Sequence, residues 1–242
     1  MTTVLKLGGS VITDKERAET VDGPALDRAA DAVAGHDDLV LVHGGGSFGH
    51  HNAKEYGVST TDGTHDVEGV LDIHNAMKAL NGLVLRRLHA RDVPAVPVHP
   101  LSAASRDADG ELTLPARQVE TLLDEGFVPV VHGDVVAHAG EGVTVLSGDE
   151  IVTSLATSLD ADRVGLCSTV PGVLDAGDVV IPRIGAYEDV ASVLGGADTT
   201  DVSGGMAGKV QTLLALETPA SIFGLDDLAG FLAGESPGTT ID

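Results

Sequence analysis

Glycine and histidine are concentrated in one short stretch, residues 41–51, which reads LVHGGGSFGHH. Four of the six residues from Gly44 to Gly49 are glycines, and an apolar run precedes them. Glycine lets backbone N–H groups approach a ligand, and successive N–H groups between a strand and a helix form a cradle for an anion. A ligand-free tight turn needs fewer glycines. We therefore interpret the loop as a phosphate site, with His50 at its edge as a further donor.

This loop matches neither of two common phosphate motifs. A P-loop would continue with Gly-Lys-Ser/Thr, and no such triplet follows Gly49. A dinucleotide-binding fold would place an acidic residue at the end of the next strand, and none stands there. The motif alone therefore predicts a bound phosphate without saying which molecule carries it.

Lysines are scarce in this chain, which makes their positions informative. Of five lysines, Lys6 precedes Gly8 and Gly9 at the end of an apolar run, and Lys209 follows the glycines of a second segment, 201–209 (DVSGGMAGK). For Lys6 we favour a phosphate contact over a solvent-facing strand end. For Lys15 the sequence supports a surface role and a phosphate contact equally.

A carboxylate in the run 147–150 (SGDE) has two interpretations. Ser147 or Asp149 caps a following helix. Alternatively, Asp149 places its charge close to the lysines at the junction of a strand and a helix. Both interpretations stay open at this point.

Strands and helices alternate along the chain. Apolar runs and their spacing predict strands at 3–7, 39–43, 95–98, 127–132, 163–167 and 221–223, an edge strand at 179–181, and a hairpin over 135–146. The helical pattern covers 24–35, 66–90, 119–126, 147–159, the segment entered from 198–209, and 225–232, before a polar tail at 234–242. This order predicts an α/β protein with a mostly parallel sheet, in which ligands bind at the carboxyl ends of the strands.

Composition excludes several classes of protein. Its 242 residues suit one domain with an aliphatic core, since hydrophobic residues make up 43% and aromatic residues 2%. A net charge of −23 argues against a nucleic-acid partner. The single cysteine, Cys167, excludes a disulfide framework and favours the cytoplasm. We expect no membrane span and no targeting segment. We read the acidity as a halophilic adaptation, the alternative being simple solubility.

Several anion-binding loops and three lysines at one sheet edge indicate two phosphate-bearing molecules. Phosphoryl transfer needs such an arrangement, because donors must neutralise the moving group and hold donor and acceptor in line. Mg²⁺ usually bridges the nucleotide phosphates in such reactions. The sequence contains no pattern typical of a metal site formed by side chains alone, since His50 and His51 are adjacent and no histidine pair has the spacing of a zinc site.

Four segments together resemble a known family. The runs 6–10 (KLGGS), 43–46 (HGGG), 147–150 (SGDE) and 203–209 (SGGMAGK) are similar in order and spacing to those of the amino acid kinase superfamily. The resemblance implies a three-layer αβα sandwich. It also implies one domain over 1–242, with a substrate lobe at about 1–160 and a nucleotide lobe at about 161–242, and a homodimer.

The first glycine loop narrows the resemblance. Its sequence GGGSFGH is similar to that of the isopentenyl phosphate kinases, whereas relatives that phosphorylate amino acids, carbamate or UMP lack a histidine at the place of His50. The resemblance implies ATP-dependent phosphorylation of isopentenyl phosphate to isopentenyl diphosphate in an alternative mevalonate pathway, with Mg²⁺. The apolar tail would lie against the helix predicted at 66–90.

Residue roles follow from the resemblance. ATP would be bound by Lys6, Leu7, Gly8, Gly9, Ser10, Gly46, Thr169, Gly205 and Lys209. Isopentenyl phosphate would be held by Gly45, Gly49, His50, Gly148 and Asp149. Catalysis would depend on Lys15, His50, Lys6 and Asp149, with Lys15 stabilising the transition state.

The chain departs from the family pattern at one loop, and two alternative functions remain open. The family's nucleotide loop often reads Thr-Asp-Val-Asp-Gly-Val, whereas this chain has Thr169 and Pro171 in place of the two aspartates. The first alternative is a kinase of the same fold with a fosfomycin-type or acetylglutamate-type acceptor. The second is a regulatory nucleotide-binding protein without catalysis. The retained residues Lys6, Lys15, Asp149 and Lys209 argue against it.

Overall fold

The computed structural model describes residues 1–194 and 205–242. Its strands are β1 (Thr3–Leu7), β2 (Leu39–His43), β3 (Ala95–Val98), β4 (Ser105–Arg106), β5 (Leu112–Thr113), β6 (Val128–His132), β7 (Asp134–His138), β8 (Gly142–Leu146), β9 (Arg163–Ser168), β10 (Arg183–Ile184), β11 (Ala220–Gly224) and β12 (Thr239–Ile241). Its α-helices are α1 (Gly9–Ile12), α2 (Gly23–Val33), α3 (Gly46–Glu55), α4 (Val67–His89), α5 (Arg117–Asp124), α6 (Gly148–Ser158), α7 (Ala191–Leu194), α8 (Gly205–Leu214) and α9 (Leu228–Leu232).

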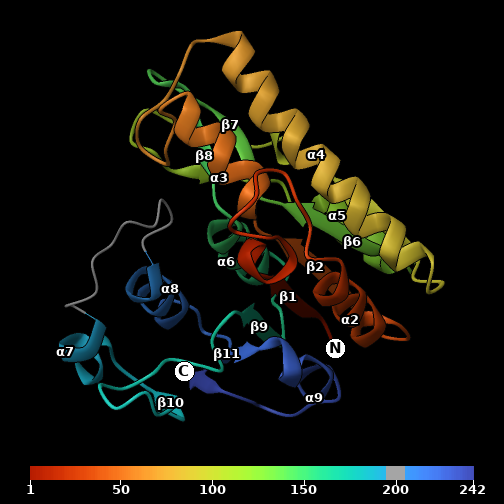
Figure 1. Ribbon diagram of the computed structural model, residues 1–242, viewed down its shortest axis with the longest axis vertical. Coiled ribbons are helices and arrows are strands. Elements are labelled where there is room, and N and C mark those ends of the chain that lie inside the picture. The colour runs from red at the N-terminus through yellow and green to blue at the C-terminus, as the bar shows by residue number, and fades with distance from the viewer. Residues whose placement is uncertain (195–204) are drawn as a thin grey trace.

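Two sheets make up the strand framework. The larger has the order β10-β12-β11-β9-β1-β2-β6-β3, and its pairs are parallel except for β11 with β12. The smaller has the order β5-β4-β7-β8. Figure 1 shows the hairpin of β7 and β8 beside α3 and α4, at the end of the molecule away from β10. The prediction of a mostly parallel α/β sheet is confirmed.

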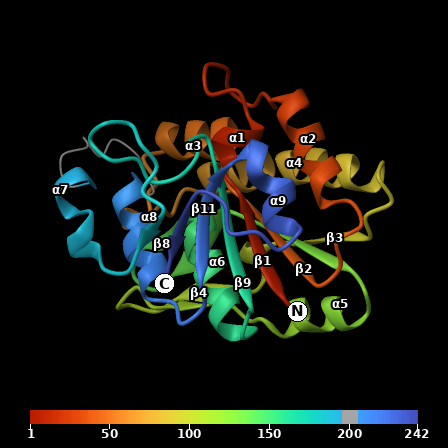
Figure 2. The same ribbon diagram turned by 90° about the horizontal axis from the view of Figure 1, so that it is seen from below.

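Helices cover both faces of the larger sheet, as side chains along β1 illustrate. Val4 belongs to the hydrophobic cluster that includes side chains of α5, α6 and α8, whereas Leu5 and Leu7 belong to the cluster with α2, α4 and α9. Successive side chains of a strand point to opposite faces, so an apolar run buries both. Figure 2 shows α2, α4 and α9 on one side of the sheet and α5 and α6 on the other. The three-layer αβα architecture is confirmed.

The long helix α4 forms one wall of the cavity that is described in the next subsection. The Asp66 side chain caps it by accepting from the Glu68 N–H at 3.0 Å. Ile73, Met77 and Leu80 are buried at helical spacing. Among the helices that the structure describes, none is both long and apolar enough to cross a membrane.

Two predicted segments differ in the structure. Residues 179–181 do not form a sheet strand: Val180 pairs with Leu174 in an isolated bridge, and the edge strand β10 begins only after Pro182. The polar tail contains β12, whose Ile241 is fully buried beside β11. Both errors involve strands of two or three residues, too short to show a period. The predicted loop residues 201–204 lie outside the described residues.

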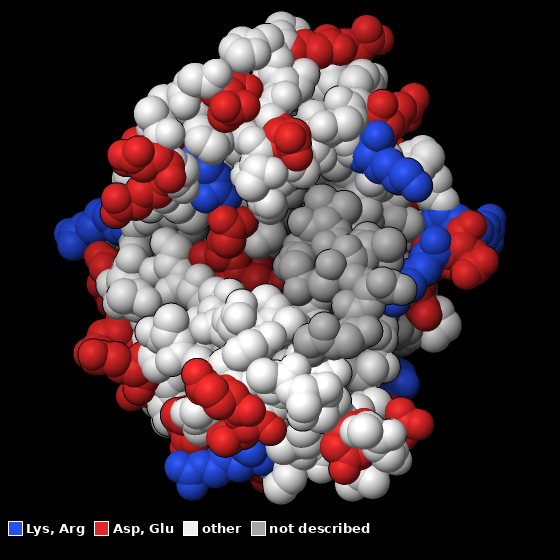
Figure 3. Space-filling view, turned by 90° about the vertical axis from the view of Figure 1, so that its left-hand side faces the viewer, with Lys and Arg blue, Asp and Glu red and all other residues white. Residues whose placement is uncertain are grey.

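Acidic side chains are spread over the molecular surface. Figure 3 shows Asp and Glu at several separate places on one face, with fewer Lys and Arg. The charge is therefore a property of the whole surface on this side rather than of one patch. Like charges at this density repel one another unless salt screens them.

Candidate active site

One cavity brings the predicted site residues together at the carboxyl ends of β1, β2 and β9. Its volume is about 240 Å³. With the exception of Leu7, every predicted site residue lines it: Lys6, Gly8, Gly9, Ser10, Lys15, Gly45, Gly46, Gly49, His50, Gly148, Asp149, Thr169, Gly205 and Lys209. Leu7 as a whole is 1% exposed, its side chain packs in the core, and its carbonyl accepts from the Gly44 N–H, so the structure does not bring Leu7 to the cavity.

Besides the single turn of α1, three of the helices that the structure describes begin at this cavity. The first residues of α3, α6 and α8 are Gly46, Gly148 and Gly205, and all three line it. The first N–H groups of a helix have no partner within the helix, and the helix dipole places partial positive charge there. Convergence of three such ends makes the cavity suitable for highly charged anions such as a nucleotide triphosphate.

A buried carboxylate lies between two of the lysines. Asp149 Oδ1 is 2.7 Å from Lys6 Nζ, and its Oδ2 is 3.5 Å from Lys209 Nζ. Burial opposes ionisation of Asp149, but the two ammonium groups outweigh it and lower the pKa of the carboxyl group. Asp149 therefore stays ionised at neutral pH and holds the two lysine side chains at fixed positions beside the cavity.

The two N-terminal glycine segments touch through their backbones. A Cβ atom on Gly9 would lie 2.1 Å from the Gly46 nitrogen, and Gly46 itself has a φ of +49°. Thr13 Oγ1 donates to the Gly9 carbonyl at 2.8 Å and accepts from the Ser47 N–H at 3.0 Å. Only glycine fits at this approach. The loops after β1 and β2 therefore form one rigid wall of the cavity.

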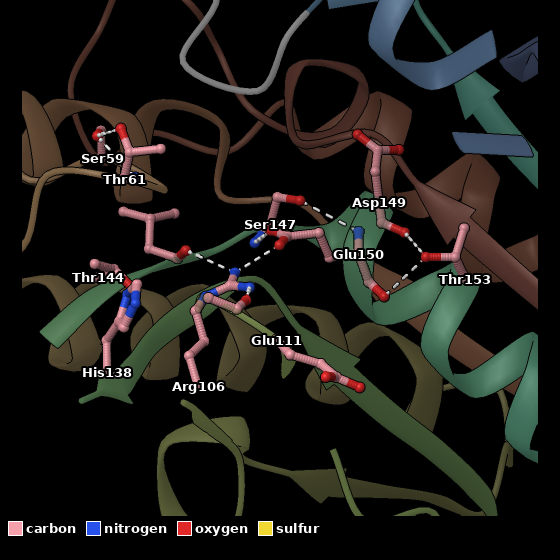
Figure 4. Close-up of polar contacts among 12 residues, drawn as sticks. Ser59, Thr61, Arg106, Glu111, His138, Thr144, Ser147, Asp149, Glu150 and Thr153 are labelled. Atoms are coloured by element: carbon pink, nitrogen blue, oxygen red, sulfur yellow. Dashed lines mark hydrogen bonds and ion pairs between the residues drawn. The ribbon is translucent and has the colours of Figure 1, made fainter. Parts of the chain in front are cut away.

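The start of α6 is held by Arg106, a residue that the sequence did not mark as part of the site. Ser147 and Glu150 form a capping box, so Ser147 caps α6 and the alternative that Asp149 caps it is wrong. Arg106 of β4 donates through Nη2 to Glu150 Oε1 at 2.5 Å (Figure 4). The Arg106 side chain is 6% exposed. This ion pair connects the small sheet to α6, the helix that contains Asp149. Arg106 and Glu150 are far apart in the sequence, so no local pattern could predict their contact.

The cavity also has an apolar part. Ala53 of α3, Ile73 and Met77 of α4, and Val145 and Leu146 of β8 line it. The expectation that the helix at 66–90 borders the cavity is confirmed by Ile73 and Met77. Gly49 serves this packing, because a Cβ atom there would lie 2.9 Å from Met77 Sδ.

A row of four histidines, two of them fully buried, lies next to the cavity, and no sequence motif indicated it. His74 Nδ1 is 2.9 Å from both carboxylate oxygens of Asp134, which lines the cavity. His99 Nδ1 is 2.8 Å from His132 Nε2, and the His132 and His43 rings stack with centroids 5.5 Å apart. The histidines come from different elements, which explains why no motif revealed them.

Because His43 and His132 are fully buried, we expect the stability of the folded protein to decrease in acid. Burial lowers the pKa of His43 to about 4, and burial together with the neighbouring His43 lowers that of His132 to about 3. Because the unfolded chain binds these protons near pH 6.5, stability is complete above that pH and falls as the pH decreases towards 4. For His43 alone this amounts to about 3 kcal/mol.

Urea unfolding at pH 7.5, 6 and 5 in molar KCl checks this expectation, since high salt removes the competing effect of surface repulsion. The variant His43→Asn should show a shallower decrease in the free energy of unfolding over this range. An equal decrease in both proteins would contradict the assignment of the effect to His43.

Comparison with known proteins agrees with this geometry. The profile of the amino acid kinase family matches residues 1–218. The isopentenyl phosphate kinase of Haloferax volcanii is 63% identical over 98% of this chain and 97% of its own length. That of Methanocaldococcus jannaschii is 32% identical over 100% of this chain and 99% of its own.

Solved structures give the same result. The chain superposes on an X-ray structure of isopentenyl phosphate kinase with a TM-score of 0.86 and 30% identity, each chain covered completely. A substrate complex of isopentenyl phosphate kinase gives a TM-score of 0.80 and 26% identity, over 100% of this chain and 99% of the other. Acetylglutamate kinase of Aeromonas hydrophila is also similar, at 31% identity over 99% of this chain and 98% of its own length.

Proposed function

This chain belongs to the amino acid kinase family, in the group of isopentenyl phosphate kinases, and we propose that it transfers the γ-phosphoryl group of ATP to isopentenyl phosphate. The products are isopentenyl diphosphate and ADP. The acceptor phosphate is already ionised at neutral pH, so it needs no strong general base. The work of the protein is then to position the two molecules and to stabilise the charge that moves between them.

One observation carries this proposal: a single cavity joins a cationic part to an apolar part. Lys6, Lys209 and the starts of α3, α6 and α8 supply positive charge and N–H donors. Ile73 and Met77 supply an apolar wall. A small molecule with a phosphate at one end and a short hydrocarbon tail satisfies both parts, whereas a charged amino acid would bury its second carboxylate against apolar side chains.

The two lobes contribute different parts in this proposal. The lobe at about 1–160 supplies Gly45, Gly49, His50 and Gly148 to the acceptor. The lobe at about 161–242 supplies Thr169, Gly205 and Lys209 to ATP, whose phosphates extend to the segment from Lys6 to Ser10. Thr169 is exposed where it lines the cavity, and its backbone is available despite the missing aspartates.

Magnesium accompanies ATP in this proposal. Within the described residues, no cluster of three or more His, Cys, Asp or Glu side chains is arranged to hold a metal ion. Mg²⁺ commonly binds through nucleotide phosphates and water with one or two carboxylates, and Asp134 and Asp149 are the carboxylates among the described residues that line the cavity. The ion would neutralise phosphate charge there. The homodimer and the cytoplasmic location stay predictions from the sequence.

A comparison of acceptors tests the proposed function. ADP release from Mg-ATP is measured in molar KCl with isopentenyl phosphate, fosfomycin, N-acetylglutamate and UMP at equal concentrations. We expect kcat/KM for isopentenyl phosphate to exceed the others by orders of magnitude. A preference for N-acetylglutamate or fosfomycin would reassign the acceptor, and absence of turnover with all four would favour a regulatory nucleotide-binding protein.

Replacement of Lys15 by alanine should lower kcat more than it raises KM for ATP. Lys15 is exposed and lines the cavity, and its ammonium group would meet charge that grows in the transition state. We expect a decrease of about 10²-fold in kcat, measured by steady-state ADP release. Lys54→Ala is the matched control, because Lys54 is an exposed lysine of α3. A change confined to KM would contradict the transition-state role.

Salt should stabilise this protein. With a net charge of −23, repulsion among surface carboxylates opposes folding in dilute buffer, and the relative in Haloferax volcanii accords with a halophilic origin. We expect the thermal midpoint to rise by at least about 10 °C between 0.1 and 2 M KCl, a gain of a few kcal/mol. Greater stability in dilute buffer than in molar KCl would leave solubility as the role of the acidic surface.

A further inference from the structure

Among the hydrogen bonds of the described residues, one peptide group of the first glycine loop is bound by a side chain and by no backbone group. The Gly44 N–H donates to the Leu7 carbonyl at 3.0 Å, which continues the pairing of β1 and β2. The Gly45 carbonyl accepts from the Gly49 N–H at 3.0 Å, which begins α3. Between these two bonds lies the peptide that joins Gly44 to Gly45. Because glycine rotates easily on either side of it, neither the sheet nor the helix fixes its orientation.

The His43 ring contacts the carbonyl of this peptide. Its Nδ1 is 3.1 Å from the Gly44 oxygen, and the ring is fully buried. A carbonyl oxygen can only accept, so Nδ1 carries the proton and donates it. The peptide is trans, so its N–H points the opposite way from its C=O. With the carbonyl turned to the buried ring, the Gly45 N–H faces away from the ring, and Gly45 is a residue that lines the cavity.

A second side chain fixes which ring nitrogen carries the proton. Asn81 of α4 is 1% exposed, and its Nδ2 lies 3.2 Å from His43 Nε2. An amide nitrogen donates, so Nε2 must accept and stay unprotonated. Within the described residues, Asn81 Oδ1 is buried without a hydrogen-bond partner. Because His43 donates from Nδ1, its Nε2 is an acceptor, and the amide nitrogen of Asn81 faces it although Asn81 Oδ1 goes unsatisfied.

We propose that His43, held in its Nδ1–H tautomer by Asn81, is a positioning residue that turns the Gly44–Gly45 peptide so that its N–H binds the acceptor phosphate. Donation to the carbonyl also polarises the peptide and strengthens its N–H as a donor. The assignment of Gly45 to the acceptor rests on the proposed function. The chain Asn81–His43–Gly44 thus connects α4, which borders the apolar part of the cavity, with its phosphate part.

His132 provides an internal comparison. It is equally buried, stands opposite His43 in the paired strands β2 and β6, and makes the same kind of bond, from Nδ1 to the Gly133 carbonyl at 2.8 Å. The peptide after Gly133 leads directly into β7, where Asp134 pairs with Leu146. The sheet therefore holds that peptide without the histidine. Loss of either imidazole should reduce stability, but only loss of His43 should affect phosphate binding.

The first test observes the tautomer. In ¹⁵N-labelled protein at neutral pH, the side-chain nitrogen shifts distinguish Nδ1–H from Nε2–H in each histidine. We expect His43 to show a protonated Nδ1 and an unprotonated Nε2, and Asn81→Leu to remove this preference. An Nε2–H tautomer for His43 in the unaltered protein would overturn the proposal.

The second test separates positioning from stability. We expect His43→Leu to raise KM for isopentenyl phosphate by about tenfold or more, the loss expected for a hydrogen bond to a charged group, with KM for ATP changed less than about twofold. His43→Asn retains a donor near the position of Nδ1 and should restore KM to within a few-fold. Equal KM effects in His43→Leu and His132→Leu would show a merely structural role and overturn the proposal.

A further measurement distinguishes failure of the proposed kinase function from failure of the positioning role of His43. If the unaltered protein does not phosphorylate isopentenyl phosphate, titration with inorganic phosphate replaces the kinetic arm. We then expect the Gly45 amide resonance to shift on phosphate addition in the unaltered protein and in His43→Asn, and much less in His43→Leu. A Gly45 resonance that responds equally in all three proteins would overturn the positioning role, whichever acceptor the enzyme uses.

Discussion

Replacement of His50 by alanine is expected to lower kcat by about 10²–10³-fold, the usual loss when one donor to transition-state charge is removed. His50 lies on the first turns of α3, is exposed, and lines the cavity next to Gly49. Its imidazole would donate to the phosphate that attacks or to the group in transit. Asparagine at this position should also be impaired, because the shorter amide does not reach the same point.

The fold should tolerate this change, which makes the kinetic result interpretable. An exposed side chain contributes little to the core, so we expect the free energy of unfolding to change by less than about 1 kcal/mol. His51→Ala is the matched control: His51 is the next residue of α3, is exposed, and is not among the described residues that line the cavity. Steady-state ADP release and urea unfolding measure both properties. Unchanged turnover in His50→Ala would exclude its role.

Replacement of Asp149 by asparagine should impair both activity and stability. The change keeps the shape of the side chain but removes the charge that lies 2.7 Å from Lys6 Nζ and 3.5 Å from Lys209 Nζ. Loss of one partner from a buried ion pair costs about 3–5 kcal/mol. The two ammonium groups would also lose their fixed positions, and we expect kcat/KM to fall by about 10²-fold.

An anion should compensate part of the stability loss in Asp149→Asn. Sulfate or phosphate bound in the cavity supplies the negative charge that the variant lacks, so the anion should raise its thermal midpoint more than that of the unaltered protein. Asp226→Asn is the control, because Asp226 pairs with Arg28 at the exposed surface and such pairs contribute about 1 kcal/mol or less. A smaller anion response in Asp149→Asn than in the unaltered protein would contradict this electrostatic role.

Local patterns predicted the regular elements well wherever they were long or bordered by glycine. The apolar runs at 3–7 and 39–43 became β1 and β2 with the same bounds. The helix predicted at 66–90 became α4, Val67–His89. By contrast, β10 and β12 have two and three residues, and partners distant in sequence define them. A strand of that length has no period of its own, so the sequence could not reveal it.

The candidate site residues could also be predicted from local patterns in the sequence. Lys6 is the last residue but one of β1, Gly45 lies between β2 and α3, and His50 lies within α3. Asp149 is the second residue of α6, and all four residues line the cavity at the sheet edge where the carboxyl ends of parallel strands meet. Glycine loops and rare lysines were visible without a structure because their residue types are unusual for their positions. The sequence by itself thus determined the fold class and half of the residues that line the cavity, and it predicted that the glycine loops bind phosphate.

Only the tertiary structure decided how those residues are supported. Arg106 reaches Glu150 from the small sheet, Asn81 reaches His43 from α4, and the pairing of Asp149 with both Lys6 and Lys209 joins segments far apart in the chain. Such contacts are set by the packing of whole elements, and the residues that make them are ordinary in their local sequence. Support of a site depends on distances in space, which a one-dimensional pattern of residue types does not contain.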